Sequence, residues 1–173
     1  MRQVIAVAFS LFAATAAQAA EPATPKEAMA PLKPLVGRWQ GEGWMSTPAA
    51  GRQTFLSEEI VSERVGGAAL LVEGLHKSKV APNPVVHDAM GVIVWSPRDK
   101  AYRFRTNLST GMYGDHPMTV EPGKFTWGMT VGNGGKVEYV TQFTADTWHE
   151  AGRYSPDGQT WTPIFEMTLK KKP

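Results

Sequence analysis

The 173-residue sequence contains no cysteine, which excludes disulfide bonds, thiolate metal sites and cysteine nucleophiles. Neither charge is in large excess: the formal net charge is +2, and the only basic run is Lys170-Lys171-Lys172 near the end. A charge this small and scattered excludes the basic surface that nucleic-acid-binding domains present. We therefore expect a fold stabilised by its hydrophobic core alone, and no nucleic-acid partner.

Signatures of common catalytic and metal sites are missing as well. No Gly-x-Ser-x-Gly elbow, phosphate-binding loop or dinucleotide fingerprint occurs. The 4 histidines never fall in His-x-His or His-Glu-x-x-His spacing, so we expect no metal site. These absences make the fold easier to predict than the function.

A long hydrophobic run occurs only at the start of the chain. The sequence is apolar from Val4 to Ala17 and continues Gln18-Ala19, a pattern typical of a secretory signal peptide cut after Ala19. The run is shorter than the ~20 residues that span a bilayer. We therefore expect a signal peptide over residues 1–19, a periplasmic or secreted protein, and no membrane span.

From Gly37 onward the sequence has the period-2 alternation of β-strands. Runs such as Lys136–Thr144 alternate apolar and polar residues and are separated by turn-length segments such as Gly132–Gly135. Counting these runs predicts about 8–10 strands with no helix between them. We expect an all-β fold, a single antiparallel β-barrel over residues 37–171.

The segment before the first strand contains four prolines between residues 22 and 34, which allow one or two helical turns but no long helix. We expect a linker and short helix over residues 20–36. Leu32, Leu35 and Val36 are expected to pack on the end of the barrel beside Trp39.

Two strands carry features that bear on closure of the barrel. Gly41 and Gly43 fall on one face of the first strand, where missing side chains let a neighbouring strand come close. The run Gln53–Val65 mixes apolar and acidic residues without a clear inward face, so we expect a bulge near Ser57.

Several motifs together resemble a bacterial secreted family of unknown function with a calycin-like barrel. They are Val36–Gly43, Val65–Gly67, Leu71–Gly74 and Ser155–Trp161. The opening Gly-x-Trp is also similar to lipocalins and nitrobindin-like haem barrels, which implies a barrel whose mouth admits a small apolar molecule. The nitrobindin-like proteins carry a haem-binding histidine near the C-terminus, and the last strand here has none. We therefore expect no cofactor and keep haem as an alternative.

Five residues are candidates for binding a ligand inside such a barrel. Tyr102 and Phe104 share one strand face, Tyr139 lies on a clean alternating face, and Trp44 lies near a strand end. His149 and Glu150 are neighbours in a strand, so one of them faces the interior, and His149 is the candidate ligand-binding residue.

Our leading hypothesis is a monomeric or homodimeric protein that binds a small apolar or amphipathic molecule. The second is an enzyme that uses His149 or a buried glutamate as base. The third is a solid barrel that binds a partner through the loops at residues 77–88 and 109–117. The candidate glutamates are Glu58, Glu59, Glu63 and Glu73. Arg103 and Arg105 share one strand face and either coat the outside or bind a carboxylate or phosphate.

Overall fold

The computed structural model describes residue 22 and residues 24–173, so the predicted signal peptide lies outside the described residues. The helical elements are α1 (Pro25–Ala28) and the 3-10 helices η1 (Ala30–Leu35), η2 (Val65–Gly67) and η3 (Gly132–Gly134). The strands are β1 (Gly37–Thr47), β2 (Gly51–Arg64), β3 (Ala69–Ser78), β4 (Val85–Ser96), β5 (Ala101–Leu108), β6 (Tyr113–Glu121), β7 (Lys124–Thr130), β8 (Lys136–Phe143), β9 (Thr147–Ser155) and β10 (Thr162–Lys172). Over these residues, no helix has the length and apolar character needed to cross a bilayer.

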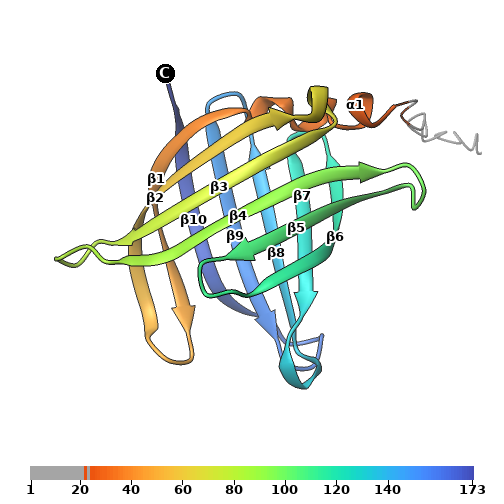
Figure 1. Cartoon of the computed structure of the whole chain (residues 1–173). Helices are drawn as coiled ribbons and strands as arrows, with labels where there is room; N and C mark the ends of the chain where they lie inside the picture. The colour runs from red at the N-terminus through yellow and green to blue at the C-terminus, as the bar shows by residue number, and fades with distance from the viewer. Residues whose placement is uncertain (1–21, 23) are drawn as a thin grey trace, which may run out of the picture.

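The strands form one closed antiparallel barrel, which confirms the predicted fold class. Each strand pairs with the next in sequence, and β1 pairs with β10 to close the ring (Figure 1). Chain direction therefore alternates around the wall, and side chains alternate between the interior and the outside.

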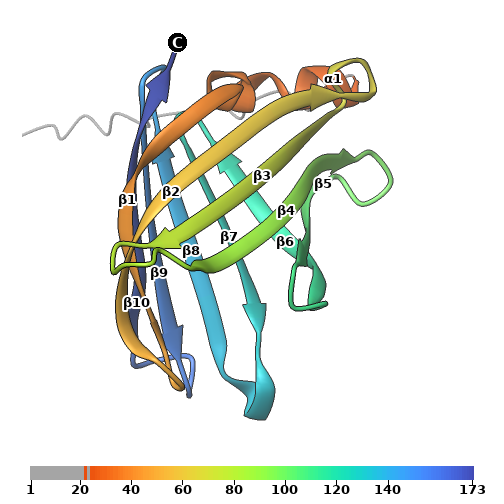
Figure 2. The same ribbon diagram turned by 60° about the vertical axis from the view of Figure 1, so that its left-hand side comes forward.

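The helical segment lies across one end of the barrel, the end at which β1 begins and β2 finishes (Figures 1 and 2). Thr24 caps α1 and exchanges hydrogen bonds with Glu27 in a capping box. Leu32 and Leu35 of η1 are fully buried, and the Trp39 Nε1 donates a 2.7 Å hydrogen bond to the Leu35 carbonyl. This confirms the predicted packing beside Trp39. The helical segment does not cover the opposite end of the barrel, where the turns after β1, β7 and β9 lie.

The glycines of β1 let the first and last strands approach each other. A Cβ atom on Gly41 would lie 2.0 Å from the Thr168 carbonyl oxygen, and one on Gly43 would lie 2.3 Å from the Glu166 carbonyl oxygen. Both carbonyls belong to β10, so side chains at these positions would push apart the pair of strands that closes the barrel.

The predicted bulge near Ser57 is wrong, because β2 pairs without interruption with both of its neighbours. Its inward face consists of Phe55, Ser57, Glu59 and Val61, all buried. The alternation was obscured because a glutamate and a serine face inward while Leu56 is 49% exposed on the outside. A bulge does occur in β10, where the register shifts between Pro163 and Phe165.

Closure through β1 is tested by Gly41→Ala, with Gly132→Ala as the matched control. We expect Gly41→Ala to lower the free energy of unfolding by about 2 kcal/mol or more, because a buried backbone contact is overpacked. No atom lies within 4 Å of a Cβ at Gly132, so this control should keep wild-type stability. Urea unfolding measures both variants, and equal losses would contradict the proposed role of Gly41.

Candidate functional site

The barrel encloses a cavity of about 360 Å³, so its interior is not completely filled by side chains. The lining runs from Leu35 of the helical segment to Ser46 and Thr47 at the far end of β1 and Met129 at the end of β7. The cavity is therefore closed by η1 at one end and reaches the opposite end of the barrel. Most of its lining side chains are apolar or aromatic.

A buried glutamate and a buried histidine meet in the cavity wall. Glu59 of β2 is 6% exposed and His76 of β3 is 3% exposed, and the Nε2 of His76 lies 3.0 Å from the Oε1 of Glu59. Burial raises the pKa of Glu59 to about 8 and lowers the pKa of His76 to about 4. At neutral pH both shifts favour the uncharged forms, so the contact is a hydrogen bond between neutral groups.

Gly74 makes room for the Glu59 carboxyl group. Gly74 is the direct cross-strand partner of Glu59, and a Cβ atom there would lie 2.7 Å from each carboxyl oxygen. Because position 74 has no side chain, the carboxyl group lies over the β3 backbone and reaches the diagonal neighbour His76. The ring of His76 is held parallel to Phe55, with ring centroids 4.3 Å apart.

Two further titratable groups border the same cavity. His87 of β4 lies beside His76, with ring centroids 5.0 Å apart, and burial lowers its pKa to about 4. Glu150 of β9 accepts a 3.2 Å hydrogen bond from the Trp148 Nε1, and burial, followed by the proximity of Glu59, raises its pKa to about 7. Glu150 is half-buried and lines the cavity.

The aromatic wall of the cavity comes from β5, β7, β8 and β10. Trp127 stacks on Tyr139, with centroids 4.6 Å apart and planes 14° from parallel. Phe104 meets Trp127 edge to face at 5.0 Å, and Phe165 meets Tyr139 edge to face at 5.7 Å. Edge-to-face contacts fix these rings, so the wall has a defined shape.

Two of the five predicted ligand-binding residues, Phe104 and Tyr139, line the cavity. Tyr102 shares the inward face of Phe104, but its hydroxyl group donates a hydrogen bond to the Ala28 carbonyl beneath the helical segment. The expectation for Trp44 is wrong: its indole lies on the outer face, where Nε1 donates to Glu166 at 3.1 Å and the Arg52 guanidinium covers the ring.

The prediction that one residue of the pair His149 and Glu150 faces inward is confirmed, but the inward residue is Glu150. His149 lies outside, 3.3 Å from the Glu166 carboxylate. The choice follows from the phase of β9, because Trp148, two residues before Glu150, is buried in the core. A histidine on the outer face cannot bind a haem iron in the cavity, so position 149 offers no support for haem.

Four glutamates were named from the sequence as candidate bases for an enzyme, and of these Glu59 is the buried one. The pair Glu59 and His76 was not predicted, because its residues lie on different strands and neither belongs to a short motif. Arg103 and Arg105 lie on the outer face of β5, where both contact Asp115. Across residue 22 and residues 24–173, no three histidine or acidic side chains converge in a way that could hold a metal ion.

A larger hollow of about 550 Å³ lies on the outside of β2 to β5. Its acidic side chains, Glu58, Glu73 and Asp88, have at most partial burial, and Met90 beside them is 47% exposed. An open hollow of this kind gives a ligand little enclosed surface, whereas the interior cavity combines enclosure with buried polar groups. The interior cavity is therefore the candidate site.

Glu59 should make stability depend on pH. A carboxyl group whose pKa is about 8 when folded and near 4.5 when unfolded stabilises the fold fully below pH 4.5, and this contribution is lost as the pH rises through 8. The lowered pKa of His76 acts in the opposite sense, since its contribution is lost as the pH falls from 6.5 through 4.

We therefore expect the free energy of unfolding to decline less between pH 5 and pH 8 in Glu59→Gln than in the wild type, by up to about 3 kcal/mol. Urea unfolding across this range measures the difference. Glu166→Gln, on the outer face, serves as the control and should keep the wild-type slope. Parallel curves for Glu59→Gln and the wild type would show that Glu59 is ionised in the folded protein at neutral pH.

Solved structures of distant sequence share this fold. The crystal structure of Rv2717c from M. tuberculosis aligns with a TM-score of 0.62 and 15% identity, covering 82% of this chain and 95% of that one. The S-type phycobiliprotein lyase CPES from Guillardia theta aligns with a TM-score of 0.54 and 13% identity, covering 82% and 89%. No family model and no curated protein matches the sequence. The chain thus has a calycin-like barrel fold, while membership of a secreted family stays a prediction.

Proposed function

We propose that the protein binds one small apolar or amphipathic molecule inside the barrel. The observation that carries this proposal is the cavity of about 360 Å³ with a mostly apolar wall and a few polar groups at Glu59, His76 and Glu150. Ligand sites of proteins have this character, with volumes of roughly 300–1,000 Å³. The volume is at the small end of that range, which favours a compact ligand.

Burial of apolar surface would supply the affinity. A ligand that removes ~200 Å² of apolar surface from water gains about 5 kcal/mol, from which the cost of immobilisation is subtracted. The aromatic rings Phe104, Trp127 and Tyr139 offer the flat contact surface. Entry would occur past Ser46 and Met129, at the end opposite η1, because η1 covers its own end of the barrel.

We also propose that the protein acts in the periplasm or outside the cell. This part of the proposal rests on the signal-peptide pattern over residues 1–19, which lies outside the described residues. Fractionation of the source cells tests it: the protein should leave with the periplasmic or culture fraction and begin at Ala20. A full-length protein in the cytosol would contradict it.

A second candidate function is an enzyme acting on a small molecule in the same cavity. The hydrogen bond between Glu59 and His76 favours it, because a buried carboxyl group with a raised pKa can exchange a proton with a bound substrate near neutral pH. In that case Glu59→Gln would abolish turnover and leave substrate binding in place. A pure binding protein would show no turnover in either form.

The binding function is tested with Ala89→Phe, which adds a ring to the cavity wall, and Ala151→Phe, which adds the same ring to the outer face of β9. We expect wild type and Ala151→Phe to bind the neutral fluorescent probe N-phenyl-1-naphthylamine at one saturable site. Ala89→Phe should bind it at least about tenfold more weakly, a loss of ~1.4 kcal/mol. Fluorescence titration measures the three proteins.

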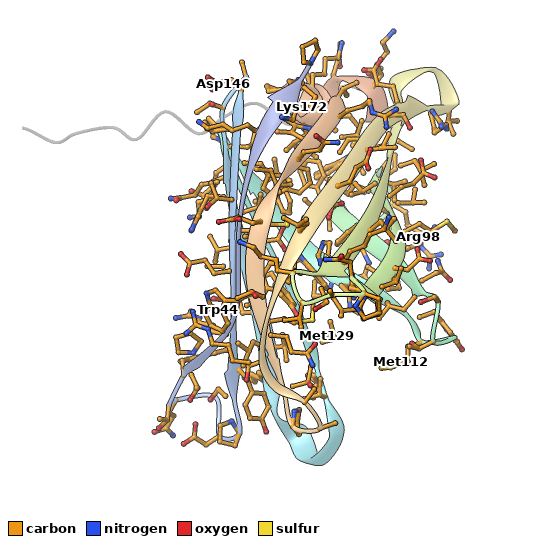
Figure 3. All side chains as sticks on the ribbon, turned by 90° about the vertical axis from the view of Figure 1, so that its left-hand side faces the viewer. Trp44, Arg98, Met112, Met129, Asp146 and Lys172 are labelled. Carbon is orange, nitrogen blue, oxygen red and sulfur yellow. The ribbon has the colours of Figure 1, made fainter. Side chains whose placement is uncertain are left out.

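Equal probe binding by the two phenylalanine variants would place the site outside the cavity. The exposed apolar residues at the loops, such as Met112 at 68% and Val85 at 53%, would then be the next surface to examine. Figure 3 shows Met112 at the tip of the loop between β5 and β6, away from the barrel.

A further inference from the structure

The cavity lining contains acidic side chains but no lysine or arginine to neutralise them. Among the described residues that line it, two are carboxylic acids, Glu59 and Glu150, and none is lysine or arginine. The Glu59 carboxyl group is close enough to raise the pKa of Glu150 electrostatically. Buried charges in proteins are normally paired, so two carboxyl groups without a cation are an unusual lining for an apolar cavity.

The other titratable groups that face these carboxyl groups cannot supply the missing positive charge. His76 on β3 and His87 on β4 both have pKa values lowered to about 4 by burial, so both are neutral at pH 7. Tyr139 on β8 has its pKa raised to about 12, first by burial and then by Glu150. At pH 7 the Glu59 carboxyl group therefore keeps its proton for the most part, whereas Glu150, with a pKa of about 7, is partly ionised without a cation to pair with.

Two further observations point to an occupant of the site. The Nδ1 of His76, on a side chain 3% exposed, has no hydrogen-bond partner among the described residues, although buried polar atoms are normally paired. The cavity wall also offers the stacked rings of Trp127 and Tyr139, and aromatic faces attract ammonium groups. Carboxylates together with aromatic faces form a site suited to an organic cation.

We propose that the ligand is an amphipathic organic cation whose ammonium group binds to the carboxylates of Glu59 and Glu150 and whose apolar part packs against Trp127 and Tyr139. The proposal rests on the proposed function, since it names the class of molecule that the cavity takes. An anionic ligand would find no lysine or arginine to pair with among the lining residues, and a neutral one would form no ion pair with either carboxyl group. On binding, a cation displaces protons: each carboxyl group that ionises releases one proton to solvent.

The test compares octyltrimethylammonium with octan-1-ol by isothermal titration calorimetry at pH 6, 7 and 8. The quaternary ammonium has no proton to lose, so any pH dependence of its affinity belongs to the protein. We expect its affinity to rise at least about tenfold from pH 6 to pH 8, because one or more carboxyl groups must ionise. Octan-1-ol should bind with an affinity independent of pH.

Substitutions of single glutamates show which carboxyl groups bind the ammonium group. Glu59→Gln and Glu150→Gln should each weaken octyltrimethylammonium binding by about tenfold or more at pH 8 while changing octan-1-ol binding by less than about twofold. Glu166→Gln, which removes an exposed carboxyl group paired with Trp44 and His149 outside the barrel, should change neither. The pH series on the wild type gives the same answer if a variant fails to fold.

The possible failures are distinguishable. If both compounds bind alike at every pH, the cavity is a small-molecule site and the inference of a cation is overturned. The inference would also be overturned if octan-1-ol bound more tightly than octyltrimethylammonium at pH 8, or if Glu59→Gln bound octyltrimethylammonium more tightly than the wild type does. If neither compound binds, the proposed function fails, and the inference fails with it.

Discussion

The pairing of β1 with β10 is the constraint on which the rest of the structure depends. It gives every strand two neighbours, so the sheet has no open edge, and it fixes an interior and an exterior for all ten strands. The pairing is close because Gly41 and Gly43 have no side chains to separate β1 from β10. Once the ring is closed, the period of two along each strand decides which side every residue occupies. Glu59 and Glu150 are inside because they share a phase with Val61 and Trp148, which belong to the core.

Closure also explains the chemistry of the interior. The two glutamates are held away from water by a wall of apolar and aromatic side chains, so their uncharged forms are favoured. Gly74 gives the Glu59 carboxyl group room against β3, and the diagonal position of His76 gives it a hydrogen-bond partner. Retaining acidic groups in such a place lowers stability as the pH rises, a cost that a purely structural core could avoid with an apolar residue. The proposed binding function gives these residues a reason to be there.

The barrel and its covered end could be predicted from the sequence, because alternation, turn residues and the prolines before Gly37 are local signals. The site could be predicted only in part. Phe104 and Tyr139 lie on strands with regular alternation and were placed correctly, whereas Trp44 is five residues after buried Trp39 and so lies on the opposite face. The pair Glu59 and His76 depends on the register between β2 and β3, which no short motif encodes. In β2 the apolar Leu56 faces outward and the acidic Glu59 faces inward, the reverse of the usual arrangement. The inner face of this strand could therefore not be identified from the order of its polar and apolar residues.

The central claim is that the barrel interior holds a carboxyl group that is uncharged at neutral pH. Carbon-13 NMR of the glutamate side-chain carboxyl groups, assigned with Glu59→Gln and followed from pH 3 to pH 10, measures this directly. The account predicts that the Glu59 signal titrates with a midpoint near pH 8, well separated from the exposed glutamates. A midpoint near 4.5, the ordinary value for glutamate, would show an ionised Glu59 and contradict both the neutral hydrogen bond to His76 and the chemistry inferred from it.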